Sequence, residues 1–294
     1  MAGRVTAAPR RIPAVPYAHV PGFRPLELDL VLPAASGAPA PLVIALHGGG
    51  WRVGSRRSMG PAYADADPFG QFAAAGIAVA GIDYRLSGEA RWPAQLEDAR
   101  AALEWVRGHA DELGVDPGRV GAWGESAGGH LAALLGLTAD PALAAVACWY
   151  TPSDLRALPG DRGADPTDPD TREAQLLGAP QAAVPERAAR ASPVAHVHSA
   201  APPFLLLHGR ADRAVPCVQS ERFAAALVAA GARADLHVYD GADHVWAGAP
   251  DAAADALDRT ITFLRAHLAT APDRRADAAA HAPARSPEPC RRPR

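Results

Sequence analysis

Short apolar runs alternate with longer amphipathic segments along most of this chain. Residues 26–32 (LELDLVL) alternate apolar and polar side chains, which predicts a strand with one buried face. Other runs are almost wholly apolar and end at Gly, Pro or charged residues, as is typical of strands inside a parallel sheet covered on both faces. These expected strands occupy residues 42–46, 77–82, 120–123, 144–149 and 204–207, and residues 234–239 form a further one.

Helical periodicity fills the segments between these runs. Residues 93–109 have Pro at the first turn, and their apolar side chains recur at the spacing of one helix face. Residues 219–230 and 252–268 follow the same period. Because strands and helices alternate, we expect one α/β domain over residues 26–268, with a doubly wound, mostly parallel sheet that has helices on both faces. Residues 1–25 are expected to be an N-terminal extension.

Two stretches interrupt the alternation. Residues 152–192 are rich in Pro, Asp, Ala and Arg, and they are long for a connection between two core strands. They are a candidate lid or substrate-facing insertion, with a solvated surface excursion as the alternative. Residues 271–294 are rich in Ala, Pro and Arg and have no apolar periodicity, so we expect a disordered tail there.

Composition narrows the classes of function. A net charge of −3 over 294 residues gives no electrostatic reason to expect nucleic acid or an anionic membrane as a partner. The sequence has no lysine, which excludes a Walker A motif, a lysine Schiff base with pyridoxal phosphate and Ser–Lys catalysis. Its three cysteines are widely spaced, which argues against a zinc site or a disulfide framework. Since no apolar run is long enough to span a bilayer, we expect a cytoplasmic protein. We also expect the protein to use neither a metal ion nor a cofactor.

A serine between two glycines is the first candidate for chemistry. The pentapeptide Gly124-Glu125-Ser126-Ala127-Gly128 follows one expected strand and precedes a helical segment at residues 129–135. A strand that turns sharply into a helix exposes the serine hydroxyl at the tip of the turn, and glycine-sized neighbours allow the chains to approach closely there. Ser126 is therefore a candidate nucleophile, and a glycine-rich turn without chemistry is the alternative.

A glycine triplet is the second candidate. His47-Gly48-Gly49-Gly50-Trp51 follows the strand expected at residues 42–46. Consecutive glycines at a strand end leave backbone N–H groups accessible. Acyl transfer needs such donors for the oxygen that becomes negative in the tetrahedral intermediate. Gly49 and Gly50 are the expected donors, together with the amide of Ala127, which follows the candidate nucleophile.

A serine nucleophile also needs a base and an acid that orients the base. His244 lies in a turn-rich loop after the last expected strand. Loops at the carboxyl ends of parallel strands converge on one crevice, so we expect His244 to lie beside Ser126 as the general base. Asp212 follows the preceding strand and is expected to accept the imidazole N–H of His244. Three other aspartates are rivals for this role, Asp154 first and then Asp240 and Asp243.

Five motifs follow one another along the chain: HGGGW (47–51), DYRL (83–86), GESAGGHLA (124–132), HGRADRAVP (208–216) and DHVW (243–246). Together they resemble an α/β-hydrolase of the HGGG-type carboxylesterase group, which is BD-FAE-like or hormone-sensitive-lipase-like. The resemblance implies that Ser126 is the nucleophile, His244 the base and Asp212 the acid. It implies an oxyanion hole made by Gly49, Gly50 and Ala127. In this family DYRL is a structural motif near the site rather than a catalytic one.

The resemblance implies a serine hydrolase that cleaves small or medium acyl esters of small molecules through an acyl-enzyme. A polar insertion at residues 152–192 points away from long-chain lipids. Trp51 and Trp246 are candidates to line an acyl or alcohol pocket, with packing in the core as the alternative. Other functions left open are those of an arylformamidase, a prolyl-oligopeptidase-like peptidase, or an acyl-transfer or cyclisation enzyme in a biosynthetic pathway. The oligomeric state is also open, a homodimer included.

Overall fold

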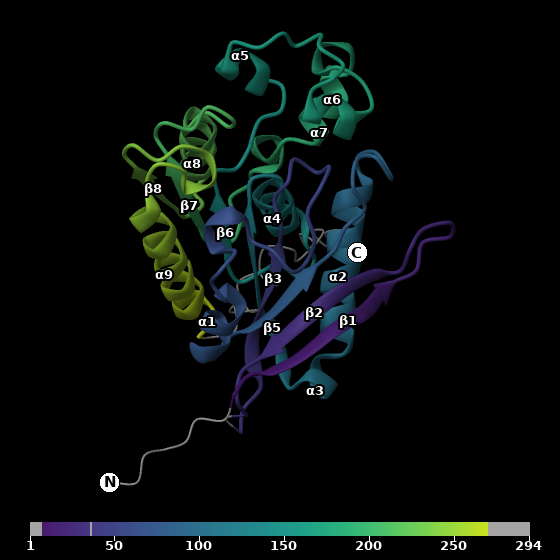
Figure 1. Cartoon of the computed structure of the whole chain (residues 1–294), viewed down its shortest axis with the longest axis vertical. Helices are drawn as coiled ribbons and strands as arrows, with labels where there is room; N and C mark the ends of the chain where they lie inside the picture. Colours follow the sequence, from purple (N-terminus) through teal and green to yellow (C-terminus); the bar gives the residue numbers. More distant parts are fainter. Residues whose placement is uncertain (1–7, 36, 270–294) are drawn as a thin grey trace, which may run out of the picture.

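An eight-stranded sheet forms the centre of the structure, a computed structural model that describes residues 8–35 and 37–269 (Figure 1). The strand order is β1-β2-β4-β3-β5-β6-β7-β8. The pairings β1–β2 and β2–β4 are antiparallel and the other five are parallel, which confirms the doubly wound, mostly parallel sheet. The strands are β1 (Arg10–Ala18), β2 (Leu26–Leu32), β3 (Ala40–Leu46), β4 (Ala78–Ile82), β5 (Val115–Glu125), β6 (Val146–Trp149), β7 (Phe204–Gly209) and β8 (Ala234–Tyr239).

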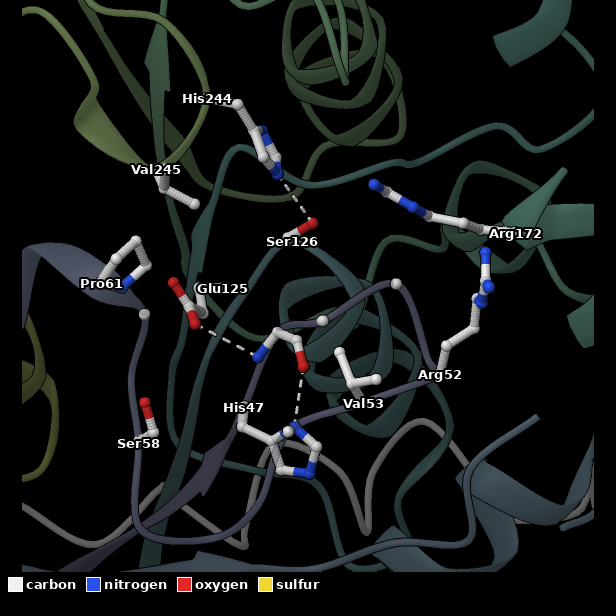
Figure 2. Close-up of a pocket in the computed structure, with 15 residues that line it drawn as sticks. His47, Arg52, Val53, Ser58, Pro61, Glu125, Ser126, Arg172, His244 and Val245 are labelled. Atoms are coloured by element: carbon white, nitrogen blue, oxygen red, sulfur yellow. Dashed lines mark hydrogen bonds between the residues drawn. The ribbon is translucent and has the colours of Figure 1, made fainter. Parts of the chain in front are cut away.

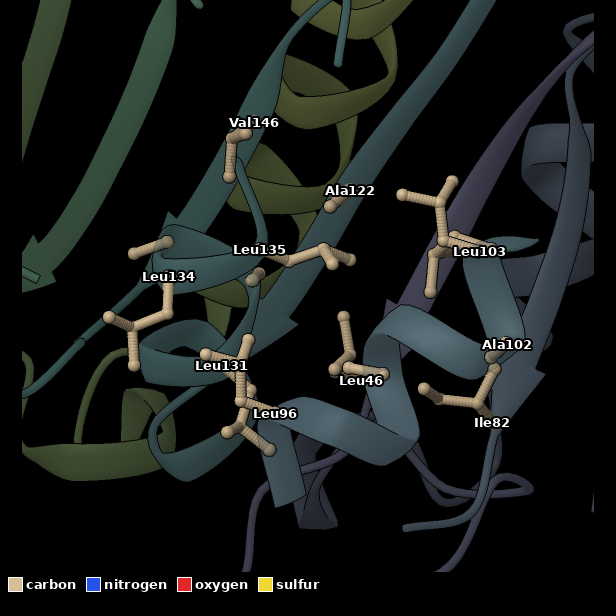
Figure 3. Packing of buried hydrophobic residues seen from close by; sticks show 14 of the residues in the cluster. Leu46, Ile82, Leu96, Ala102, Leu103, Ala122, Leu131, Leu134, Leu135 and Val146 are labelled. Carbon is tan, nitrogen blue, oxygen red and sulfur yellow. The ribbon is translucent and has the colours of Figure 1, made fainter. Parts of the chain in front are cut away.

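Helices cover both faces of the sheet. The core on one face holds buried side chains of α2 (Ala94–Gly108), α4 (Ala127–Thr138) and α8 (Val218–Ala229). Figure 3 shows leucines of α2 and α4 packed among side chains of the neighbouring strands β3 to β6. The core on the other face holds side chains of α1 (Pro68–Ala74) and α9 (Pro250–His267). A short helix, α3 (Ala110–Leu113), follows α2. Since neither face is left bare, the sheet can carry apolar side chains on both sides.

The sheet begins earlier in the chain than residue 26, where the expected domain starts. β1 lies inside the segment expected to be an N-terminal extension, and it pairs with β2 at the edge of the sheet. Its sequence, RRIPAVPYA, includes Pro13 and Pro16, and most of its side chains are exposed. Proline is tolerated on an edge strand because one side of that strand needs no ladder hydrogen bonds. An exposed strand of this kind lacks the apolar alternation by which the other strands are recognised.

The segment at residues 152–192 contains three short helices, α5 (Leu158–Arg162), α6 (Arg172–Leu177) and α7 (Pro185–Arg190). In Figure 1 they lie together beyond the sheet, at the end where the parallel strands finish. Leu158, Leu176 and Leu177 are buried, so the segment is docked on the domain by apolar contacts rather than fully solvated. One-turn 3₁₀ segments complete the described elements: η1 (Pro61–Tyr63), η2 (Gln181–Ala183), η3 (Pro193–His196) and η4 (His244–Trp246).

The tail expected at residues 271–294 lies outside the described residues. Within the described residues, none of the helices combines the length and the apolar character that crossing a membrane requires.

Candidate active site

Ser126, His244 and Asp212 lie in one hydrogen-bonded chain. The Oδ2 atom of Asp212 is 2.7 Å from Nδ1 of His244, and Nε2 of His244 is 3.1 Å from Oγ of Ser126 (Figure 2). A carboxylate only accepts, so Nδ1 carries the proton and Nε2 is left to accept the serine hydroxyl. The three side chains come from the ends of β5, β7 and β8, which the parallel sheet brings to one edge.

The Asp212 carboxylate is enclosed and fully bonded. Its side chain is inaccessible to solvent, and its Oδ1 atom accepts the amides of Ala214 and Val215 at 2.9 and 2.8 Å. His208 lies 3.3 Å from Oδ2 on the other side. Burial would raise the pKa of Asp212, but the hydrogen bonds from His208 and His244 outweigh it and lower the pKa to about 2. Asp212 is therefore ionised at neutral pH. An ionised carboxylate at this position could stabilise positive charge on the His244 ring.

The rival aspartates lie elsewhere. Asp154 accepts the amides of Arg156 and Ala157, so its carboxylate closes a turn. The other two are engaged with arginines, Asp240 with Arg210 and Asp243 with Arg213.

Ser126 stands on a strained turn between β5 and α4. Its φ of 50° and ψ of −117° lie outside the regions that L-residues ordinarily adopt. The turn is compact: a Cβ atom on Gly128 would lie 2.0 Å from the carbonyl oxygen of Leu46, the last residue of β3. Only glycine allows the start of α4 to approach β3 this closely. The strained serine and the loop that follows β3 are therefore held against each other.

That loop carries backbone amides toward the serine. Among the described residues, the amides of Gly49, Gly50 and Ala127 have no hydrogen-bond partner. Gly49 has a φ of 105°, and a Cβ there would lie 2.1 Å from the carbonyl oxygen of Val53. The glycine thus permits a tight turn in which Arg52 N and Val53 N both bond to Gly49 O. Gly49 and Gly50 line the same cavity as Ser126, and unpaired backbone donors in such a cavity can stabilise negative charge on an acyl oxygen.

The loop is supported from behind by buried aromatic and imidazole rings. Tyr84, from the DYRL motif, stacks on His47 at 4.3 Å and donates from its hydroxyl to the carbonyl of His47 at 2.9 Å. Trp51 donates from Nε1 to Nδ1 of His130 at 3.3 Å. Burial lowers the pKa of His130 to about 4, so its ring is neutral at pH 7 and can accept that bond.

A family model named BD-FAE matches residues 28–227. The chain belongs to the BD-FAE family. Its sheet and helices have the α/β-hydrolase fold, as the resemblance implied.

Curated relatives of this BD-FAE protein include two esterases of Mycobacterium tuberculosis. Esterase LipC is 36% identical over 63% of this chain and 47% of its own length. Esterase LipQ is 34% identical over 74% of this chain and 53% of its own length. The chain thus spans about half the length of these relatives.

Solved structures of similar fold are also esterases. A truncated carbohydrate esterase from gut microbiota has a TM-score of 0.77 and 26% identity, covering 92% of this chain and 99% of its own. The thermophilic esterase Est2 of Thermogutta terrifontis has a TM-score of 0.71 and 28% identity, covering 89% of this chain and 94% of its own.

A cavity of about 580 Å³ opens beside Ser126 in the BD-FAE protein. Its lining includes the expected residues Gly49, Gly50 and His244 (Figure 2). Ala127 is fully buried behind the serine. Trp51 and Trp246 do not belong to the described lining of this cavity, and each is only 2% exposed. Trp51 packs edge-on against His130. Trp246, the last residue of η4, packs edge-on against Trp149 and Tyr150. Both rings therefore support loops rather than line the cavity.

Two kinds of lining residue were not expected from the sequence. Glu125 is 3% exposed and accepts hydrogen bonds from Gly48 N at 3.2 Å and from the Tyr150 hydroxyl at 2.5 Å. Burial raises the pKa of Glu125 in spite of these bonds. The sequence signal that could have identified Glu125 as a lining residue is its position next to Ser126 in the motif. Arg52 and Arg172 also line the cavity, and Arg172 comes from the segment at 152–192. Within residues 8–35 and 37–269, no cluster of three or more His, Cys, Asp or Glu side chains could hold a metal ion.

Proposed function

We propose that the chain is a serine carboxylesterase in which Ser126, His244 and Asp212 form the catalytic triad. The single observation that carries the proposal is the hydrogen-bonded chain of 2.7 and 3.1 Å that ends at Ser126. The amides of Gly49, Gly50 and Ala127, which have no partner among the described residues, support the proposal as candidate donors of an oxyanion hole. The esterase names of the curated and structural relatives support the same class of reaction.

The reaction follows from the geometry. The Ser126 oxygen attacks the ester carbonyl while its proton passes to Nε2 of His244, and Asp212 stabilises the imidazolium. The carbonyl oxygen becomes negative and accepts hydrogen bonds from the amides of Gly49, Gly50 and Ala127. The C–O bond to the alcohol breaks as His244 returns the proton to the leaving oxygen, which leaves an acyl-enzyme. A water molecule then attacks the acyl group by the same route and releases the acid and free Ser126.

Small and medium acyl esters are the proposed substrates. The cavity of about 580 Å³ has room for such esters. A panel of p-nitrophenyl esters of increasing acyl length measures this range directly. N-formylkynurenine, assayed at the same concentration, tests the arylformamidase alternative, because amide and ester carbonyls use the same machinery.

The decisive experiment removes the nucleophile. Ser126→Ala should lower kcat for p-nitrophenyl acetate by roughly 10⁶-fold, the size of effect typical of a triad nucleophile. A fluorophosphonate should label the wild type at Ser126, located by peptide mass spectrometry, and should not label the variant. Ser199→Ala, at an exposed turn before β7, is the matched control and should keep full activity. Undiminished turnover in Ser126→Ala would disprove the assignment.

A further inference from the structure

Two arginine side chains share the cavity with Ser126. Arg52 belongs to the turn that follows the glycine triplet, and Arg172 is the first residue of α6, in the segment at 152–192. Both line the cavity. Figure 2 shows the guanidinium group of Arg172 directed toward Ser126 and the Arg52 side chain directed toward Arg172. The fold thus brings two cations from separate segments to one opening.

Neither guanidinium is neutralised within the described residues. Arg56, which lies four positions after Arg52 in the chain, pairs with Asp29 and Asp83 at 2.6 Å each. By contrast, Arg52 and Arg172 form no ion pair or hydrogen bond from their side chains to any residue in 8–35 or 37–269. The carboxylate in the cavity lining is Glu125, which is buried and already bonded to Gly48 and Tyr150. The opening therefore carries unbalanced positive charge.

Arg172 is held in place although its side chain is exposed. Its stem packs on the glycine loop, because its Cδ atom lies 2.5 Å from the point where a Cβ on Gly50 would be. Thr171 caps α6 by accepting the amide of Ala174 at 3.0 Å. Glu173, 2% exposed, pairs with Arg162 at 2.8 Å and anchors the next residue. A guanidinium on a fixed stem loses less conformational freedom when it binds an anion than one on a mobile segment does.

We propose that Arg52 and Arg172 bind a carboxylate of the substrate, so that the preferred esters carry a negative charge on the acyl or alcohol part. This inference rests on the proposed function, since it names the substrate class of the same site. A guanidinium presents N–H groups in a planar fork that matches a carboxylate bidentately, which an ammonium group cannot do. Two such forks on one opening select a carboxylate over an uncharged group of the same size. They also favour encounter with anionic esters by raising their local concentration.

The test compares matched charged and neutral esters. One pair is 4-nitrophenyl hydrogen adipate and 4-nitrophenyl hexanoate, which differ by a carboxylate on the acyl part. The other pair is 4-acetoxybenzoate and 4-acetoxybenzamide, which differ on the alcohol part. The wild type should show a higher kcat/KM for the anionic member of at least one pair. Raising NaCl from about 50 to 500 mM should reduce this preference, because salt screens exposed charges.

Two variants assign the preference to the arginines. Arg52→Gln and Arg172→Gln should each lower the ratio of anionic to neutral kcat/KM by about 3- to 10-fold, the range expected for solvent-exposed charge-assisted hydrogen bonds. Arg172→Glu should reverse the ratio. Arg233→Gln is the control, since Arg233 is exposed and pairs with Asp235 on β8. A wild-type ratio of one for both pairs, or ratios that neither variant changes, would overturn the proposal.

A binding measurement separates this inference from the esterase proposal. In at least one of the two pairs, Ser126→Ala should bind the anionic ester more tightly than the neutral ester, and the difference should disappear when Arg172→Gln is added. Calorimetry gives this result without any turnover. If the esters are not hydrolysed but the difference in binding is found, the esterase proposal fails and the anion site stands. Equal affinity for the anionic and neutral members of both pairs refutes the anion site whatever the rates are.

Discussion

The cavity has a reacting end around Ser126 and an open end around Arg52 and Arg172, and the two are built in different ways. At the reacting end the Asp212 side chain is fully buried, and its oxygens are occupied by His244, His208 and two amides. At the open end, two exposed arginines have no partner within the described residues. The reacting end needs preorganised groups because reorganisation during the reaction would cost rate. The open end can leave its charges free because a ligand can neutralise them.

After that of Ser126→Ala, the largest expected effect is at the reacting end. Asp212→Asn should lower kcat for p-nitrophenyl acetate by about 10⁴-fold, because an amide no longer holds His244 in the tautomer that accepts the Ser126 proton. Steady-state kinetics measures it. Asp154→Asn is the matched control, since Asp154 closes a turn and makes no contact with His244. A loss as large in the control as in Asp212→Asn would contradict the assignment of the acid.

The next effect concerns the backbone of the reacting end. Gly128→Ala should destabilise the fold by about 3 kcal/mol or more, because its Cβ would lie 2.0 Å from the carbonyl oxygen of Leu46 and would push α4 away from β3. Urea unfolding followed by circular dichroism measures the loss. Gly108→Ala, where a Cβ meets nothing within 4 Å, is the control and should stabilise α2 by up to about 1 kcal/mol. Equal stability of the two variants would show that the close approach is not needed.

The smallest expected effect is a pH dependence of the folding stability that comes from Asp212 at the reacting end. The pKa of Asp212 is lowered from 3.8 to about 2, so its ionised form stabilises the folded state above pH 4, and this contribution is lost as pH falls toward 2. Wild type should therefore lose about 2 kcal/mol relative to Asp212→Asn over that interval. Urea titrations at pH 5, 4 and 3 follow the trend.

An exposed carboxylate outside the cavity lining offers the control for this pH dependence. Hydrogen bonds that Thr167 donates from its Oγ1 and its amide also lower the pKa of Asp165, but that carboxylate is exposed in the segment at 152–192. Solvent screens such bonds, so Asp165→Asn should leave the pH dependence of unfolding unchanged. A pH dependence in Asp165→Asn that matches Asp212→Asn would show that the effect does not depend on the burial of Asp212.

The sequence predicted the reacting end better than the open end. The apolar runs locate seven of the strands because a buried parallel strand needs apolar side chains on both faces. The position of a loop after a strand then brings Ser126, Asp212 and His244 to one edge. By contrast, β1 was not predicted, because an exposed edge strand with two prolines has no apolar pattern.

Side-chain direction is the second reason for the differences. Trp51 and Trp246 occupy the expected loops, yet their rings turn inward, toward His130 and toward Trp149. Arg172 reaches the cavity only because the segment at 152–192 is docked by buried leucines. No local pattern in the sequence predicts the direction of a side-chain ring or the place where a long segment docks. These depend on tertiary packing.

The spread of the site over the chain has a consequence for folding. The glycine loop follows β3, Ser126 follows β5, Asp212 follows β7 and His244 follows β8. The assembled site thus depends on contacts between residues nearly 200 positions apart, and such nonlocal contacts form late because loop closure precedes them. During refolding, helical circular dichroism should recover before fluorophosphonate labelling of Ser126 does. The reactivity of the Ser126 hydroxyl should therefore indicate when β8, the last strand, has joined the sheet.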